Sequence, residues 1–228
     1  MVEKDAVRRS YDELAETYAA QRSENGRGTQ ILEGFLESLS DPSRVLDAGC
    51  GQGTPVLSRL SDSTRAFGVD FSREQLKLAA GNAPDAVLVQ GDMTTLPFER
   101  STFDAVVAYW SLIHVPMDDH QAVIDEFARV LRPGGRILLC EGTNRWAGEN
   151  PDWLESGVKM EWNIAGAETT RDQLRNAGFE IVDEWGVPDE PDEDSADEEA
   201  DDADEEVDED ADEHPWTFFS ARLEAQSP

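Results

Sequence analysis

The chain has 228 residues, of which 50 are acidic, 19 are basic and two are cysteines. That length suits one sizeable α/β domain, and two cysteines exclude a disulfide framework or a cysteine metal cluster. The net charge of −31 disfavours nucleic-acid binding, and the longest uncharged run, Ala105 to Met117, is too short to span a membrane. We expect a cytoplasmic protein with no metal and no membrane partner.

Two helical patterns precede the first expected strand, at Lys4–Gln21 and at about 29–39. In the first pattern, Tyr11 and Tyr18 fall on the same apolar face. The periodicity favours a helix that packs on a sheet. The alternative is that residues 1–40 form a lid that brings Tyr11 or Tyr18 over a ligand, and Tyr11 is then a candidate catalytic residue.

From residue 45 onward, short apolar runs typical of strands alternate with amphipathic runs typical of helices. Ser72 and Gln75 form the pattern of a capping box at the start of one helix, and Thr170 and Gln173 form it at another. This alternation predicts a doubly wound, mostly parallel sheet, whose last two strands pair as an antiparallel hairpin because no helix connects them. The expected strands are 45–47, 66–70, 86–90, 103–109, 136–141, 179–185 and 216–223.

A glycine-rich turn, DAGCGQG, follows the first strand from Asp47 to Gly53. Such a turn between a strand and a helix holds a ligand against backbone amides. Dinucleotide-binding proteins use a similar pattern, but a carboxylate at Asp47 would repel a pyrophosphate. The same carboxylate suits an ammonium group, so the turn indicates a nucleoside that carries an amino acid.

Two further carboxylates follow the next two strands. Asp70 ends the second strand, where it can accept hydrogen bonds from ribose hydroxyls. Asp92 follows the third strand, where it can accept from an adenine amino group while the Met93 backbone meets the ring. Each acid alone also fits a turn or cap residue, but three acids at successive strand ends predict one ligand site.

The chain resembles the class I S-adenosylmethionine-dependent methyltransferases that act on small molecules. This resemblance implies a single domain over residues 1–228 with a Rossmann-like, seven-stranded mixed sheet. Six strands would be parallel, the last antiparallel, and helices would cover both faces. The segments that carry the resemblance are YDELAETYAAQR, VLDAGCGQG, GVDFS, GDMTTLPF, FDAVVAYWSLIHVP and EFARVLRPGGRILL.

The resemblance also implies S-adenosylmethionine as the methyl donor and assigns its contacts. Asp47 would bind the amino group, Asp70 the ribose and Asp92 the adenine. The other residues of the implied donor site are Gly49, Cys50, Gly51, Gly53, Phe71, Met93 and Tyr109.

His114 follows the fourth strand, in a segment that lines the reacting end of the donor in this family. It is the only side chain of that segment that titrates near neutral pH, which suits a general base. The alternative is a histidine that donates to a carbonyl and orients the loop. Tyr109 and Trp110 fit a place near the sulfonium and a place in the core equally well.

Residues 142–168 are the expected acceptor-site insertion, and they contain three tryptophans without a clean periodicity. The tryptophans suit an apolar or aromatic acceptor, although the core of a small subdomain would use the same residues. YWSL stands where methyltransferases of amino nitrogens carry Asn/Asp-Pro-Pro-Tyr, and there is no basic stripe. We therefore expect a small-molecule acceptor and no nucleic acid.

An acidic surface loop is expected at 187–214, between the last two strands. Of the 25 residues from Asp189 to Glu213, 18 are acidic, which predicts a solvated loop. Alanines at helical spacing leave a helix at high salt as the alternative. The carboxylate excess and the scarcity of lysine resemble proteins of extreme halophiles, so we predict that molar salt stabilises the fold.

Methyl transfer to a small molecule is the predicted function. The alternative from another class is an inactive donor-binding scaffold that recruits a partner through the acidic loop. A nicotinamide oxidoreductase comes third, because the carboxylate at Asp47 counts against it. A monomer and a homodimer are both open.

Overall fold

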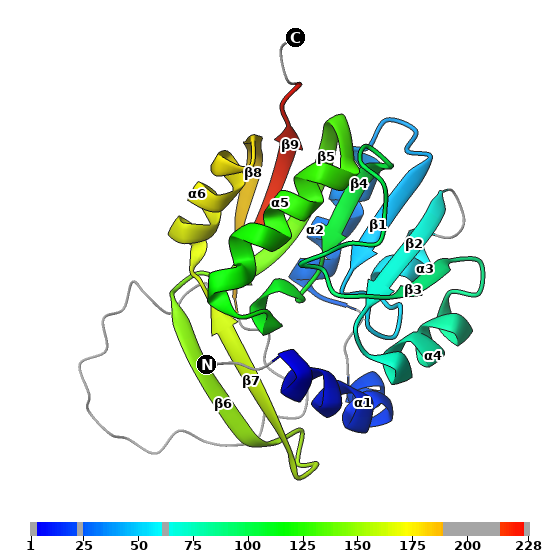
Figure 1. The fold of residues 1–228 in the computed structure, drawn as a ribbon, viewed down its shortest axis with the longest axis vertical. Coiled ribbons are helices and arrows are strands. Elements are labelled where there is room, and N and C mark those ends of the chain that lie inside the picture. Colours follow the sequence, from blue (N-terminus) through cyan, green and yellow to red (C-terminus); the bar gives the residue numbers. More distant parts are fainter. Residues whose placement is uncertain (1–3, 22–24, 61–63, 189–214, 226–228) are drawn as a thin grey trace.

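The computed structural model describes residues 4–21, 25–60, 64–188 and 215–225. A seven-stranded sheet forms its centre (Figure 1). The strands of this sheet are β1 (Arg44–Ala48), β2 (Arg65–Asp70), β3 (Val87–Gln90), β4 (Phe103–Ala108), β5 (Leu131–Gly142), β8 (Phe179–Val187) and β9 (Trp216–Leu223).

The strand order is β3-β2-β1-β4-β5-β9-β8. All neighbouring pairs are parallel except those of β9, which runs antiparallel to both β5 and β8. The predicted mixed sheet, with six parallel strands and the last one antiparallel, is confirmed. The last two strands also form the predicted antiparallel hairpin, with Val187 opposite Trp216, and the acidic run between them lies outside the described residues.

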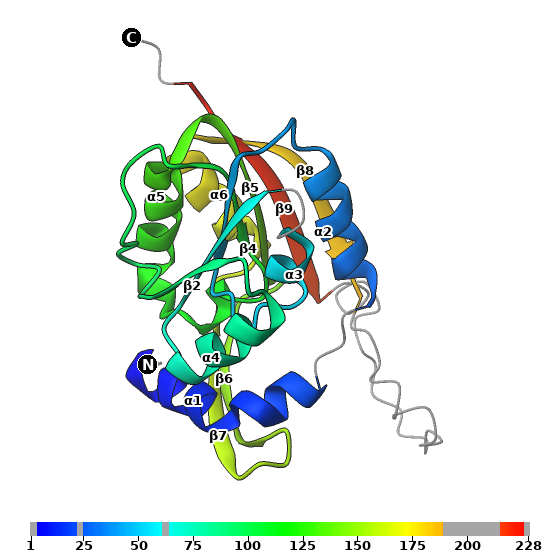
Figure 2. The same ribbon diagram turned by 90° about the vertical axis from the view of Figure 1, so that its right-hand side faces the viewer.

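Helices cover both faces of the sheet (Figure 2). On one face lie α2 (Arg27–Glu37), α3 (Val56–Leu60) and α4 (Arg73–Asn82), and on the other lie α5 (His120–Val130) and α6 (Ala167–Asn176). The central strands are therefore buried on both sides, which explains their continuous apolar runs. Among the described residues, no helix combines the length and the apolar character needed to cross a bilayer.

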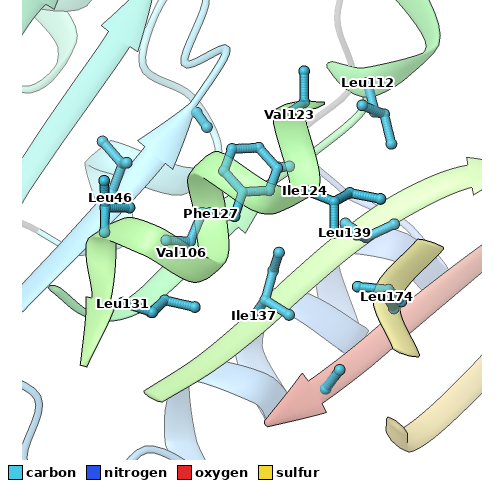
Figure 3. Packing of buried hydrophobic residues seen from close by; sticks show 14 of the residues in the cluster. Leu46, Val106, Leu112, Val123, Ile124, Phe127, Leu131, Ile137, Leu139 and Leu174 are labelled. Atoms are coloured by element: carbon cyan, nitrogen blue, oxygen red, sulfur yellow. The ribbon is translucent and has the colours of Figure 1, made fainter. Parts of the chain in front are cut away.

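Alternate residues of each central strand serve the two separate cores. Figure 3 shows Phe127 and Ile124 of α5 packed against Leu46, Val106 and Ile137 of three strands. The neighbouring positions along those strands point to the opposite face and pack against α2 and α3. Cys50 and Cys140 are both buried and form no disulfide.

The two expected capping boxes turn out differently. The Ser72 side chain accepts from the Gln75 amide at 3.2 Å, so Ser72 caps α4 as predicted. The cap predicted at Thr170 is wrong, because α6 begins at Ala167 behind Gly166 and Thr170 lies inside the helix. Gly166 takes φ 88°, a conformation that favours glycine and lets the chain turn tightly there.

A helix and a hairpin extend beyond the carboxyl ends of the parallel strands (Figure 1). The helix is α1 (Lys4–Gln21), and the antiparallel hairpin consists of β6 (Trp146–Trp153) and β7 (Val158–Ile164). α1 packs mainly against α4 and β7 rather than on a face of the sheet. The expected acceptor-site insertion, 142–168, therefore contains a regular hairpin that its sequence did not reveal.

Candidate functional site

A cavity of about 860 Å³, including its open mouth, lies where β1, β2 and β4 end. Its lining includes the strand ends and the glycine turn, which form the floor, and residues of α1, which forms part of the cover. All but one of the residues predicted for the donor and for catalysis line this cavity. They are Tyr11, Asp47, Gly49, Cys50, Gly51, Asp70, Phe71, Asp92, Met93, Tyr109 and His114.

The exception is Gly53, at the end of the glycine turn. Its φ of 91° favours glycine, and an added Cβ would lie 3.3 Å from Ala79 of α4. Gly53 therefore allows α4 to approach the turn closely. Gly53 is not among the residues that line the cavity.

Gly49 and Gly51 present bare backbone to the cavity. Both take positive φ, 76° and 51°. A side chain at Gly49 would collide with Ser111, whose hydroxyl donates to the Ala48 carbonyl at 2.7 Å. The lack of a side chain at Gly49 therefore lets the turn lie directly against the segment after β4.

At three positions of this turn the main-chain amides donate to acceptors of the protein itself and not to a ligand. The amides of Gly49 and Cys50 both donate to the Val69 carbonyl, at 2.8 and 3.0 Å, and the Gly51 amide donates to Asp70 at 2.8 Å. The expectation that these amides bind the ligand is therefore wrong at these three positions. The cause is the parallel pairing of β1 with β2, which brings the acceptors at the end of β2 within reach.

Asp70 is a buried and rigidly held carboxylate. One of its oxygens accepts from the Gly51 amide and the other from the Ser72 amide, both at 2.8 Å. Burial raises the pKa of Asp70 to about 6, and the nearby Asp12 adds to this effect against those hydrogen bonds. Each oxygen keeps lone-pair capacity for a further donor.

Asp92 lies at the rim of the cavity, with its side chain about half exposed. It accepts from the backbone and the hydroxyl of Thr94, both at 2.8 Å, and pairs with Lys4 of α1 at 3.2 Å. Burial raises the pKa of Asp92, but these hydrogen bonds and the Lys4 charge outweigh burial and lower it overall. Lys4 also pairs with Asp119 at 3.0 Å, so the start of α1 is fastened across the rim.

His114 and Tyr11 meet at the cavity wall. The Tyr11 hydroxyl lies 2.8 Å from His114 Nε2, and the Glu161 carbonyl of β7 lies 3.2 Å from Nδ1. A carbonyl can only accept, so Nδ1 carries the proton of the neutral ring and Nε2 accepts from Tyr11. Three elements distant in the sequence, α1, the turn Leu112–His114 and β7, therefore converge on one imidazole.

Aromatic rings surround this pair. Tyr11 makes edge-on contacts with Tyr18, Trp153 and His114 at centroid distances of 5.4, 5.9 and 5.2 Å. Trp162 lies behind His114 at 6.0 Å. Trp153 and Trp162 of the hairpin thus pack with α1 and His114, as the core of a small subdomain would, whereas Trp146 is half exposed. None of the three tryptophans lines the cavity.

Tyr109 and Trp110 pack in the core and also line the cavity. Trp110 packs on Trp216 at 4.5 Å, and Tyr109 packs on Phe218 at 5.7 Å. They therefore join the core to the site.

A buried pair supports the segment that follows His114. His120 and Glu141 are both fully buried, with Nδ1 and Oε2 3.5 Å apart, and His120 Nε2 donates to the Val115 carbonyl at 3.0 Å. Burial raises the pKa of Glu141 to about 8 and lowers that of His120. Burial therefore favours the neutral form of both groups.

The structure adds residues that the sequence did not single out as part of the site. Lys4, Gln52, Gln75 and Ser111 line the cavity, although none of them belongs to the expected donor set. Burial raises the pKa of the Cys50 thiol well above its usual value, which disfavours a nucleophilic thiolate. In the part of the chain that the structure describes, no cluster of His, Cys, Asp and Glu has the makings of a metal site.

Comparisons with known proteins agree with this geometry. Residues 46–139 match a family model described as a methyltransferase domain. The chain is 41% identical over 137 residues to a demethylmenaquinone methyltransferase of Mycolicibacterium vanbaalenii, a match that covers 60% of this chain and 57% of the relative. It is 29% identical over 187 residues to a tRNA (carboxymethyluridine(34)-5-O)-methyltransferase of Arabidopsis thaliana, covering 78% of this chain and 44% of the relative.

The matches span about half the length of these curated relatives. Among solved structures, the fold is similar to that of 1,6-didemethyltoxoflavin-N1-methyltransferase from Burkholderia thailandensis, determined with S-adenosylhomocysteine bound. The TM-score is 0.66 at 18% identity, and the match covers 97% of this chain and 88% of the other. At that identity the likeness shows the fold alone.

Proposed function

Because the chain belongs to the class I S-adenosylmethionine-dependent methyltransferases, we propose that it transfers a methyl group from S-adenosylmethionine to a small-molecule acceptor. The observation that carries this proposal is the set of three carboxylates, Asp47, Asp70 and Asp92, around one cavity. Lys4 is the only cation among the described residues that line the cavity, and it is paired with two acids. Such a site suits a cationic nucleoside without phosphate groups.

The residues of the floor fit the parts of this donor. Asp47, which is 2% exposed, would bind the amino group of the methionine part, and the bare backbone at Gly49 and Gly51 would leave room for its chain. Asp70 would accept from the ribose. Asp92, at the rim, would accept from the adenine amino group.

The methyl donor is already activated, so the protein mainly has to supply a proton acceptor. When bound, S-adenosylmethionine supplies a methyl group on a positively charged sulfur, so alignment contributes most of the rate. His114 Nε2 would take the proton from the acceptor oxygen or nitrogen, directly or through the Tyr11 hydroxyl at 2.8 Å. As the acceptor bonds to the methyl carbon, the carbon–sulfur bond breaks and its electrons stay on sulfur. The Glu161 carbonyl would stabilise the charged imidazole at Nδ1.

The lining of the cavity favours an apolar or aromatic acceptor. Besides the acids of the floor, aromatic rings from α1 and from the ends of β2 and β4 contribute to its walls. These rings are Tyr11, Tyr18, Phe71, Tyr109 and Trp110. We propose that α1 and the hairpin in 142–168 together cover the acceptor.

A tRNA acceptor is a second candidate, because one relative carries a tRNA in its name. Two features disfavour it here. A net charge of −31 repels phosphates, and the cavity offers no cation beyond the paired Lys4 among its described residues. An inactive donor-binding scaffold remains the alternative from another class.

The first test is calorimetric titration of S-adenosylhomocysteine into the protein in molar KCl. We expect a micromolar dissociation constant, and no binding by a demonstrably folded sample would contradict the proposed function. A second test incubates the protein with labelled S-adenosylmethionine and a panel of phenols, quinols, amines and tRNA. Labelling of a small molecule supports the proposal, labelling of tRNA favours the second candidate, and binding without any labelling favours the scaffold.

A further inference from the structure

We infer that Gln75 is a donor-binding residue whose side-chain amide meets the ribose beside Asp70. This inference rests on the proposed function and extends its donor site by one residue. The side chain of Gln75 is a buried polar group that the cap of α4 does not use. Its side chain is almost fully buried, at 1% exposure, yet neither Nε2 nor Oε1 has a hydrogen-bond partner among the described residues.

The position of Gln75 places this amide inside the donor site. It lines the cavity, and its Oε1 lies 3.7 Å from the point that a Cβ on Gly51 would occupy. The Gly51 amide is in turn bound to Asp70. The unpartnered amide therefore lies next to the bare backbone of the glycine turn and close to the carboxylate proposed for the ribose.

The backbone around Gln75 is fixed by the helix cap, and its side chain takes no part in that cap. The Gln75 amide nitrogen of the main chain donates to Ser72 Oγ at 3.2 Å, and Ser72 itself is bound to Asp70 and to Asp12 of α1. A full capping box would turn the Gln75 side chain back to the Ser72 amide. That amide instead donates to Asp70, which leaves the Gln75 side chain to the cavity.

A ribose hydroxyl can both donate and accept hydrogen bonds, and Asp70 alone can serve only one of these two roles. An ionised carboxylate only accepts, so Asp70 can satisfy hydroxyl protons but not hydroxyl oxygens. A side-chain amide both donates and accepts, so Gln75 Nε2 can donate to a hydroxyl oxygen and Oε1 can accept a hydroxyl proton. A purely structural residue at this buried position would be more favourable as an apolar side chain.

The substitution Gln75→Met tests the inference through two readouts that move in opposite directions. It keeps the approximate volume and removes both unpartnered polar atoms. We expect the melting temperature of the ligand-free protein to rise by about 2 °C, because a buried unsatisfied amide is lost. We expect the dissociation constant of S-adenosylhomocysteine, measured by calorimetry in molar KCl, to rise about tenfold.

Two nucleosides locate the contact on the ligand. Adenosine keeps both ribose hydroxyls, and 2′,3′-dideoxyadenosine lacks them. The loss caused by Gln75→Met should persist with adenosine and disappear with the dideoxy compound. An equal loss with both nucleosides would overturn the assignment to the ribose.

Gln173 of α6 provides the matched control, because its Oε1 is also buried with no partner in the described part of the chain, but it does not line the cavity. Gln173→Met should leave the dissociation constant within twofold of wild type. A Gln75→Met variant with a lower melting temperature and unchanged affinity would show a structural role and overturn this inference alone. Failure of the wild-type protein to bind S-adenosylhomocysteine would overturn the proposed function and this inference with it.

Discussion

The floor and the cover of the cavity are built in different ways. Asp47 and Asp70 of the floor lie at the ends of two paired strands, and the main-chain amides of Gly51 and Ser72 hold Asp70 in place. The cover depends on contacts between distant residues, since Tyr11 is 103 positions from His114 and Glu161 is 47 positions from it. We expect the floor to decide how tightly the donor binds and the cover to decide how fast the acceptor reacts.

Asp70→Ala is the strongest test of the floor. It removes the buried acceptor proposed for the ribose and also frees the amides of Gly51 and Ser72. We expect the affinity for S-adenosylhomocysteine in calorimetry to fall at least about 100-fold, since hydrogen bonds to a charged group are strong. Asp92→Ala, at the half-exposed rim, should cost only about tenfold. Equal losses in the two variants would break the distinction between floor and rim.

His114→Ala tests the junction between floor and cover. A general base contributes about 100-fold or more to the rate, so we expect kcat to fall by at least about 100-fold. Donor affinity should stay within about twofold, because no donor contact is removed. Tyr11→Phe, which removes only the hydroxyl at 2.8 Å from Nε2, serves as the milder companion. Unchanged turnover in His114→Ala would dismiss the base role and leave a histidine that orients the loop.

Glu141→Gln tests the buried pair of His120 and Glu141 through the pH dependence of the free energy of unfolding. The pKa of Glu141 is raised from 4.5 to about 8 by burial, so its neutral form favours folding. This contribution is complete below about pH 4.5 and is lost as the pH rises through about 8. The variant cannot ionise, so it should gain about 2 kcal/mol over wild type between pH 5 and pH 9, within the limit of about 5 kcal/mol that the shift allows.

Urea unfolding at the two pH values measures this difference. The lowered pKa of His120 acts against folding at acid pH in both proteins, so it largely cancels in the comparison. A difference between variant and wild type that does not change with pH would show that Glu141 is ionised in the folded protein.

We expect salt to raise the melting temperature through charges on the whole surface, with the smallest effect per residue. Because like charges repel at low ionic strength, we expect the melting temperature to rise by roughly 5 °C or more between dilute buffer and 2 M KCl. A variant without residues 189–213 should keep most of this rise, since the rest of the chain is also acidic. A melting temperature that does not respond to KCl would end the resemblance to halophilic proteins.

Much of the floor could be predicted from the sequence. Strand and helix periodicities indicated the order of the sheet's elements, and Asp47, Asp70 and Asp92 stand at or just after the ends of expected strands. Parallel strands end at the same edge of a sheet, so local position along the chain is enough to bring these acids together. Even there the hydrogen bonding differed, because the amides of Gly49, Cys50 and Gly51 bond within the protein.

The cover could not be predicted in the same way. β6 has most of its residues exposed and its pairing with β7 shifts register, so the hairpin lacks the alternation that identifies a half-buried strand. Gln75 matched a capping pattern, and the sequence alone does not show that its side-chain amide is buried with no hydrogen-bond partner among the described residues.

The sequence by itself determined the sheet, the glycine turn and the three acids, because each depends on neighbours along the chain. Tertiary structure alone decided that Tyr11, His114 and Glu161 meet, because α1 and β7 must first pack together beyond the strand ends. Periodicity describes which face of an element is apolar, whereas the partner of that face is chosen by packing across the whole fold.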